Sequence, residues 1–517
     1  MIAPGEPPAG PDPFGRGAMA TLPVPRWFWL LALGAFLYQL PFVLLGEQRD
    51  AGELLIAAQQ LLRGQPVYSS GYMPKTPGVP YLLAGAFVLF GPHLLVARAA
   101  VVAANLLGAW LVGCLARAQG WGGRTAFLAG VLYLFAAPQQ EGAQILTEPF
   151  LVPLAVLAAF ALLRCLQTRR LAWAVLAGAA VAGAIWIKQV GVLVLPPLGI
   201  LLAVVFLRDG GRRGWIVLAA VVFLVSCIAT LGVLVWTAVR PDNREAFWNC
   251  VVVGLLTRTQ GGLLEIAPLA GVGANPGIWV PALLLATLVL VRRPAEPGGN
   301  GPFWLTGGLM LFSLLPVIHR NFPHYYLPAL PFAAILAAVF WDATGRRLVA
   351  QHRALFALLL LGGLVLPIYR LWQAAEQLRQ GATVFRDLQV GRELRELIGD
   401  RRVFVLGYDP QYYFLVHAAP PTPHLYLYEE NLRLADPRSP DDWGQLIRSV
   451  LADVAQNRNI DYILLFGGDY DAWRYWPDEQ RDAWTVCASF PIWLYETHSY
   501  VRVELRVLRR RDGDAGS

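Results

Sequence analysis

Long apolar runs between residues 27 and 370 constrain the fold of this chain more than any other feature. They lie near residues 27–46, 80–116, 125–138, 149–166, 171–187, 190–207, 214–239, 276–291, 302–318, 325–341 and 354–370. Several reach or approach the roughly 20 residues with which a helix crosses a bilayer. Of the 517 residues, 56% are hydrophobic and 15% are charged, whereas soluble domains carry about 25% charged residues. The sequence therefore predicts an α-helical polytopic membrane protein.

Arginines gather in some of the short links between these runs, a pattern typical of cytoplasmic loops. They are Arg117, Arg124, Arg164, Arg169, Arg170, Arg208, Arg212, Arg213, Arg292, Arg293, Arg346, Arg347 and Arg353. If these loops and the N-terminus all face the cytoplasm, the run at 80–116 crosses the membrane once. Because about 37 residues are too many for one span, we predict an interfacial helix over 78–91 and a span over 93–116.

This topology gives about eleven transmembrane helices in the cell membrane, with a cytoplasmic N-terminus and an extracytoplasmic tail. The loop arginines account for the net charge of +7, so no nucleic-acid partner is expected. Residues 1–26, rich in Pro and Gly, are expected to be a disordered cytoplasmic leader. Residues 27–370 form the predicted membrane module, with a first outer loop over 47–92.

The tail, residues 371–517, changes character. Strand-like patterns lie at 402–408, 424–428, 461–468 and 500–508, and helical patterns at about 373–398 and 441–456. Such alternation predicts a small extracytoplasmic α/β domain.

The predicted outer loops collect nearly all the unusual polar residues of the membrane module. They are Asp50, Glu53, Lys75, Glu141, Glu148, Lys188, Arg240, Arg244, Arg258, His319, Arg320 and His324. An ionisable group at membrane depth costs roughly 3 kcal/mol or more and marks a functional site by default. Lys188 is the clearest case, because apolar residues flank it on both sides. It either snorkels to the interface or binds an anion.

The first outer loop carries two acids and a lysine in a restrained setting. Asp50 and Glu53 open an amphipathic segment with a spacing close to a capping box. They either only start a helix, or they also hold a carboxylate still enough to act as a general base. Lys75 stands between Pro74 and Pro77, on backbone that resists helix formation. It is either an ordinary ion-pair partner or a contact for a phosphate leaving group.

Several stretches resemble the GT-C membrane glycosyltransferases, closest to the protein O-mannosyltransferase-like and aminoarabinose-transferase-like group. The stretches "QRDAGELLIAAQQLLRGQPVY", "MPKTPGVPYLLAGAFVLFG" and "ARAAVVAANLLGA" resemble the first outer loop and second helix of that group. "IWIKQVG", "HRNFPHYYLPALPFAAILAA" and "VFVLGYDPQYYFLVHAAPPTPHLYLY" resemble its central lysine, its His-Tyr-x-x-Pro helix start and its outer domain. The resemblance implies a GT-C fold and inverting transfer from a polyprenyl-phosphate sugar.

The resemblance also implies roles for single residues. Asp50 would be the base; many members carry Asp-Glu adjacent, whereas here Ala51 follows Asp50 and Glu53 stands one helical turn on. The expected contacts of the lipid phosphate are Lys75, Lys188, Arg320, His324 and Arg258. Glu148 and His319 are candidates for acceptor or metal binding, although Glu148 could merely cap a helix and the histidines could be interfacial polar groups. The sequence identifies no cofactor, and it leaves open whether a divalent metal is bound.

The expected partners are a polyprenyl-phosphate-linked sugar, an acceptor that is a glycan, lipid or protein, and membrane lipids. A transporter or flippase of a lipid-linked substrate is the main alternative, and a non-catalytic assembly protein of the same fold is another. Transporters more often show repeated halves and broken helices near the middle of the membrane. Here the charges gather in loops on one predicted face, which favours chemistry at a surface.

Overall fold

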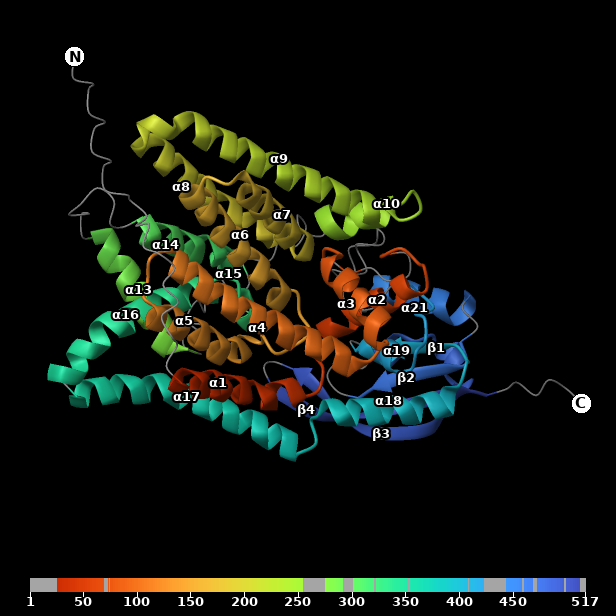
Figure 1. Ribbon diagram of the computed structural model, residues 1–517. Helices are drawn as coiled ribbons and strands as arrows, with labels where there is room; N and C mark the ends of the chain where they lie inside the picture. Colours follow the sequence, from red (N-terminus) through yellow and green to blue (C-terminus); the bar gives the residue numbers. More distant parts are fainter. Residues whose placement is uncertain are drawn as a thin grey trace, which may run out of the picture.

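Helices fill one end of the molecule and a four-stranded sheet with its own helices lies at the other (Figure 1). The computed structural model describes residues 26–68, 73, 75–253, 275–291, 301–319, 322–351, 353–407, 409–422, 443–457, 460–467, 472–496 and 499–511. The predicted leader, residues 1–26, falls outside this part except for Arg26.

Every apolar run predicted from the sequence forms a helix. These helices are α1 (Arg26–Leu44), α4 (Leu94–Ala118), α5 (Gly123–Ala136), α6 (Glu148–Thr168), α7 (Leu171–Ile187), α8 (Leu195–Arg208), α9 (Arg213–Ala238), α13 (Pro276–Val291), α14 (Gly301–Ser313), α16 (Leu330–Gln351) and α17 (Arg353–Arg379). Within the described ranges, four helical segments are long and apolar enough to cross a membrane: 94–118, 148–168, 189–208 and 210–238. The total of about eleven spans stays a prediction.

The long run at 80–116 is divided into two helices, as the sequence predicts. Helix α3 (Gly78–Phe90) ends at Gly91, whose φ of 84° suits glycine, and α4 begins after His93. The side chain of His93 accepts a hydrogen bond from the backbone N–H of Leu95 at 3.3 Å. Val88, Leu89 and Phe90 at the end of α3 are largely exposed. Such an apolar exposed end is compatible with the predicted interfacial position.

The C-terminal sheet domain, called the outer domain after its predicted position, is built around a mixed sheet with strand order β1-β2-β4-β3. Strand β1 (Val403–Leu406) pairs in parallel with β2 (Tyr462–Phe466), and β4 (Ser499–Arg510) pairs antiparallel with both β2 and β3 (Trp484–Glu496). Helix α18 (Val384–Ile398) and α19 (Gln411–Leu415) belong to one apolar cluster with these strands, and α21 (Trp443–Asn457) belongs to another. Strands β1 and β2 are buried along their whole length because both faces are covered.

The sequence prediction for the tail is correct at three strands and one helix. The strands predicted at 402–408, 461–468 and 500–508 are β1, β2 and β4, and the helix at 441–456 is α21. The predicted strand at 424–428 lies outside the described residues, and β3 was not predicted. The helical pattern over 373–398 is wrong as one helix, because Gly381, with a φ of 96°, separates α17 from α18. Since α17 runs past residue 370, the division at 370/371 falls inside a helix and stays a prediction.

A buried ion pair joins the first outer loop to the membrane helices. Arg98 of α4 pairs with Glu47, and both side chains are almost fully buried. The guanidinium also donates to the carbonyl oxygens of Ala143 at 2.8 Å, Leu45 at 3.0 Å and Gly46 at 2.9 Å. These bonds satisfy a charge that would otherwise be costly to bury, and they hold two outer loops against one helix.

The outer domain clamps the same loop from the other side. The carboxylate of Asp387 in α18 accepts the backbone N–H of Glu47 at 3.1 Å. The hydroxyl of Tyr500 in β4 donates to the carbonyl of Gly46, and the N–H of Gly46 donates to the carbonyl of Ala382 at 3.2 Å. The chain that follows α1 is therefore fixed between the membrane module and the outer domain.

Helix α2 (Arg49–Leu62) packs directly on the outer domain. A Cβ atom on Gly52 would lie 2.3 Å from the backbone nitrogen of Gln411, which is closer than real Cβ contacts allow. The obstacle is backbone of α19, which cannot rotate away. A glycine is therefore required where α2 meets α19.

We expect Gly52→Ala to destabilise the protein by about 1–3 kcal/mol, because the added methyl group overpacks this contact. Thermal unfolding of the detergent-solubilised chain measures the effect. Gly85→Ala in α3 is the matched control, since a Cβ there meets no atom within 4 Å. Equal thermal midpoints for the two variants would contradict the close contact between α2 and α19.

The junction also predicts a pH dependence of stability. Burial raises the pKa of Asp387 from its ordinary value of 3.8 to about 7, aided by the charges of Glu47 and Asp409 and opposed by the Glu47 N–H and Arg98. The folded protein thus keeps a proton that the unfolded chain releases near pH 3.8. The resulting stabilisation is complete below that pH and is lost as the pH rises through about 7.

Asp387→Asn should remove this pH dependence, because the amide oxygen still accepts the Glu47 N–H and no longer titrates. Relative to the wild type, the variant should gain thermal stability between pH 5 and pH 8. Thermal midpoints measured at unit intervals of pH decide the point, and parallel profiles for both proteins would refute the assignment.

Candidate active site

Asp50 lies in the first turn of α2 but does not cap the helix. The helix begins at Arg49, its N-cap is Gln48, and no side chain makes a capping hydrogen bond there. The capping-box interpretation of Asp50 and Glu53 is therefore wrong. The helix starts two residues earlier than that interpretation requires, and the two carboxylates bind a lysine instead of the helix end.

Lys75 joins both acids of the first outer loop. Its Nζ lies 3.3 Å from Oδ2 of Asp50 and 3.0 Å from Oε2 of Glu53. The side chain of Glu53 is 2% exposed and that of Lys75 is 16% exposed, whereas that of Asp50 is 38% exposed. Glu53 thus anchors the lysine from inside, and Asp50 is the carboxylate that an incoming molecule can reach.

The backbone around Lys75 is held by a buried tyrosine. The hydroxyl of Tyr68 donates to the carbonyl oxygen of Lys75 at 2.6 Å. Tyr68 is itself in the left-handed region, with a φ of 71°, and the amide of Asn243 donates to the neighbouring carbonyl of Val67 at 2.9 Å. A strained residue held from several sides is typical of functional loops, and here it keeps the lysine in position.

A second glycine contact brings the Lys75 loop to the end of α7. A Cβ atom on Gly78 would lie 2.5 Å from the carbonyl oxygen of Trp186 and 2.9 Å from Cα of Ile187. Lys188 follows directly and is the C-cap residue of α7, in extended backbone. The predicted phosphate contacts Lys75 and Lys188 therefore belong to segments in direct contact.

Lys188 forms an ion pair with Glu148, the first residue of α6. The glutamate is 2% exposed and the lysine 16% exposed. The ammonium also lies 4.4 Å from the ring centroid of Tyr325, a cation–π contact. Lys188 is thus partnered by an acid and an aromatic ring, and the snorkelling interpretation does not describe it.

His324 extends this second cluster. It lies in η6 (Pro323–Tyr326), with Nδ1 2.7 Å from Oε2 of Glu141 and Nε2 3.9 Å from Oε1 of Glu148. Burial lowers the pKa of His324, but the charge of Glu148 and the hydrogen bond and charge of Glu141 outweigh burial and Lys188, so the pKa is raised. The cluster therefore favours a second cation beside Lys188.

The fold agrees with known membrane glycosyltransferases. A family model described as dolichyl-phosphate-mannose-protein mannosyltransferase matches residues 74–236. ArnT from Cupriavidus metallidurans bound to undecaprenyl phosphate superposes with a TM-score of 0.58 at 17% identity, over 93% of this chain and 97% of that one. Archaeal oligosaccharyltransferase AglB from Archaeoglobus fulgidus, in complex with an inhibitory peptide and a dolichol-phosphate, gives a TM-score of 0.54 at 14% identity. The match covers 85% of this chain and 69% of that one. No curated protein matches the sequence significantly.

The chain has the GT-C fold. It is an integral membrane protein of helical architecture with a small C-terminal sheet domain. The resemblance seen in the sequence is therefore confirmed at the level of the fold.

Most of the residues predicted for the site fall into two clusters of this GT-C fold. Asp50, Glu53 and Lys75 form the first, and Glu148, Lys188 and His324 lie in the second. Arg258 and Arg320 lie outside the described residues. His319 ends α15 (Leu315–His319), and its side chain is likewise outside the described part.

Three residues of the second cluster were not recognised from the sequence. The sequence places Glu141 only among the outer-loop charges, and it predicts no role in the site for Tyr325. Tyr495 of β3, whose hydroxyl donates to Oε1 of Glu141 at 2.7 Å, carried no signal at all. The sequence offered one clue to a special backbone at Glu141, because this residue precedes Gly142 in a loop that also contains a proline.

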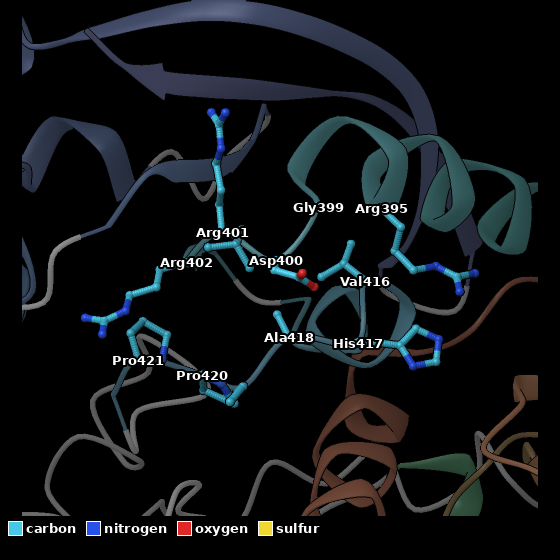
Figure 2. Close-up of a pocket in the computed structure, with 12 residues that line it drawn as sticks. Arg395, Gly399, Asp400, Arg401, Arg402, Val416, His417, Ala418, Pro420 and Pro421 are labelled. Carbon is cyan, nitrogen blue, oxygen red and sulfur yellow. The ribbon is translucent and has the colours of Figure 1, made fainter. Parts of the chain in front are cut away.

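No group of three or more His, Cys, Asp or Glu side chains is placed to hold a metal ion within the described ranges. A separate cleft of about 720 Å³ lies in the outer domain, between the end of α18, the start of β1 and residues 416–421 (Figure 2). Figure 2 shows Arg395, Arg401 and Arg402 pointing in different directions from it, and Arg401 donates to the hydroxyl of Tyr462 at 3.2 Å.

Replacing Lys188 by Met should leave Glu148 as a buried charge without its main partner. We expect a loss of about 3–5 kcal/mol in stability, the usual cost of breaking a buried pair from one side. The double variant Lys188→Met with Glu148→Gln should recover much of it. Thermal unfolding in detergent provides the comparison, and a fully stable single variant would be incompatible with the ion pair.

Proposed function

We propose that this chain is a membrane glycosyltransferase that moves a sugar from a polyprenyl-phosphate donor to an extracytoplasmic acceptor, with inversion. The observation that carries the proposal is the contact of Lys75 with both an exposed carboxylate, Asp50, and a buried one, Glu53. The similar structures support it, since ArnT is bound to undecaprenyl phosphate and AglB to a dolichol-phosphate and a peptide. The acceptor is a glycan, a lipid or a protein.

Asp50 is the proposed general base. Its carboxylate is the most exposed of the ionic groups in the two clusters, so a bound acceptor can reach it. It also stands in the first turn of α2, where the helix dipole favours a negative charge. As the acceptor oxygen or nitrogen attacks the anomeric carbon, its proton passes to Asp50.

The departing group is the lipid phosphate. The bond from the anomeric carbon to the phosphate oxygen breaks as the bond to the acceptor forms on the opposite face, which inverts the configuration. The bonding electrons leave with the phosphate, and its charge grows in the transition state. Lys75, Lys188 and His324 are the proposed cations there, since donors placed where charge develops lower the barrier.

We place the site on the extracytoplasmic side. The turn between α8 and α9 and the turn between α16 and α17 lie at the end opposite the sheet domain (Figure 1). These turns carry Arg208, Arg212, Arg213 and Arg353, the pattern expected of cytoplasmic loops. The N-terminus is then cytoplasmic, residues 371–517 are outside, and the protein resides in the inner or plasma membrane.

Asp50→Asn tests the catalytic role. We expect the variant to lose sugar transfer by about 100-fold or more while keeping the thermal stability of the wild type, because the amide cannot accept the proton. The measurement compares intact masses of cellular glycolipids and glycoproteins with no protein, the wild type or the variant.

Asp400→Asn, at an exposed position of the outer domain, is the matched control and should transfer sugar normally. A transporter or flippase of a lipid-linked substrate would retain its activity in Asp50→Asn. Undiminished transfer by this variant would therefore overturn the proposal.

A further inference from the structure

The tip region of the β3–β4 hairpin reaches from the outer domain into the second ionic cluster. Tyr495 of β3 and Tyr500 of β4 are opposed in the ladder, with ring centroids 5.1 Å apart. Tyr500 bonds to the carbonyl of Gly46 and so holds the hairpin on the first outer loop. Tyr495 turns to Glu141 instead, and its hydroxyl lies 2.7 Å from Oε1.

Glu141 uses its two oxygens in two directions. Oε1 accepts from Tyr495 at 2.7 Å, while Oε2 lies 2.7 Å from Nδ1 of His324. Because Nδ1 is engaged, the other ring nitrogen, Nε2, faces Glu148 at 3.9 Å. A carboxylate that binds one nitrogen of a histidine sets both the orientation of the ring and the role of the other nitrogen.

The backbone of Glu141 points to a requirement for its side chain. Its φ of 59° lies in the left-handed region, where a residue other than glycine is strained by about 1 kcal/mol or more. Glycine would relieve this strain and is tolerated at such positions, but it carries no carboxylate. The glutamate is held there by contacts from two different parts of the chain.

Tyr495 is suited to donate a hydrogen bond to Glu141. Burial, together with the charge of Glu141 and the hydrogen bond to it, raises the pKa of Tyr495 well above its ordinary value. The phenol therefore stays protonated and donates to the carboxylate. Tyr495 and Glu141 are 354 positions apart in the sequence, so this bond is a tertiary feature of the assembled molecule.

We propose that the outer domain completes the catalytic site: Tyr495 positions Glu141, and Glu141 fixes His324 so that Nε2, on the side of Glu148 and Lys188, is presented to the phosphate of the lipid carrier. Tyr495 and Glu141 are positioning residues, because neither touches the reacting atoms. The proposal rests on the glycosyltransferase function and adds to it a residue that the outer domain supplies.

A double-mutant cycle on the full-length chain tests the proposal with two readouts. The variants are Tyr495→Phe, Glu141→Ala and the pair, with Tyr475→Phe elsewhere in the outer domain as the matched control. The first readout is the affinity for undecaprenyl phosphate, measured by native mass spectrometry. The second is kcat and the acceptor KM for sugar transfer, and thermal unfolding confirms that each variant is folded.

Tyr495→Phe should weaken undecaprenyl phosphate binding and lower kcat, each by about 10-fold, which is the lower end of the loss when a group that orients a metal-ligating histidine is removed. The acceptor KM should stay within about twofold, since the proposed acceptor contact is Asp50 in the other cluster. In the Glu141→Ala background the same change should have no further effect, because the tyrosine acts through the glutamate.

An affinity and kcat for Tyr495→Phe equal to those of Tyr475→Phe would overturn the proposal. If Tyr495→Phe lowers affinity and kcat equally in the wild-type and Glu141→Ala backgrounds, the proposal is also overturned, since Tyr495 would then not act through Glu141. If the wild type binds undecaprenyl phosphate but transfers no sugar, the proposed function fails, whereas the binding cycle still decides the positioning role.

Discussion

The buried pairing of Arg98 with Glu47 is the interaction on which the rest of the outer face depends. Removing both charges from water costs several kcal/mol per ion unless the remaining donors are satisfied. Arg98 meets this condition by donating to carbonyls of Leu45, Gly46 and Ala143. Those carbonyls belong to the segments that lead into α2 and toward α6, so one helix fixes the two loops that carry the acids.

Helix α4 binds loop carbonyls a second time, two turns further along. The amide of Asn105 donates to the carbonyl of Gly142 at 2.8 Å, and the hydroxyl of Tyr133 donates to Asn105 at 3.2 Å. Residues seven apart lie on one face of a helix, so Arg98 and Asn105 present a polar edge to the loop around Glu141. A membrane helix with such an edge acts as a rigid reference for irregular backbone that would otherwise lack hydrogen-bond partners.

Each lysine of the site is neutralised by an acid from a different segment of the chain. Lys75 meets acids from α2, and Lys188 meets the acid that starts α6. Such pairing lets several ionic groups gather near apolar helices without an uncompensated charge. Asp50 therefore differs from Glu53 and Glu148 in the exposure of its carboxylate, and not in being an acid paired with a lysine.

Apolar and alternating patterns were enough to predict the helices and three strands, and the loop arginines together with the length of one run predicted the break near Gly91. The acids and lysines that meet in the two clusters stood out as charges beside apolar runs. These local patterns failed where long-range contacts decide. The capping rule considers only neighbours in sequence, whereas Lys75, 25 positions away from Asp50, determines where that carboxylate points.

Strand β3 escaped prediction because Ser489 and Pro491 interrupt its apolar pattern, although proline is tolerated in an edge strand. The bond from Tyr495 to Glu141 spans most of the chain, and no spacing rule could reveal it. The sequence order of the charged residues could be read from the chain, whereas their pairing required the fold.

The place of the hairpin in the sequence has a consequence for biogenesis. The membrane helices, the acids and the lysines all emerge from the ribosome before β3 and β4 do. If the last hairpin supplies the final support of the site, a chain still under synthesis holds its catalytic groups without their last restraint. Under the proposed function, transfer of lipid-linked sugars would then reach its full rate only after translation of the outer domain, which makes the order of synthesis a brake on premature transfer.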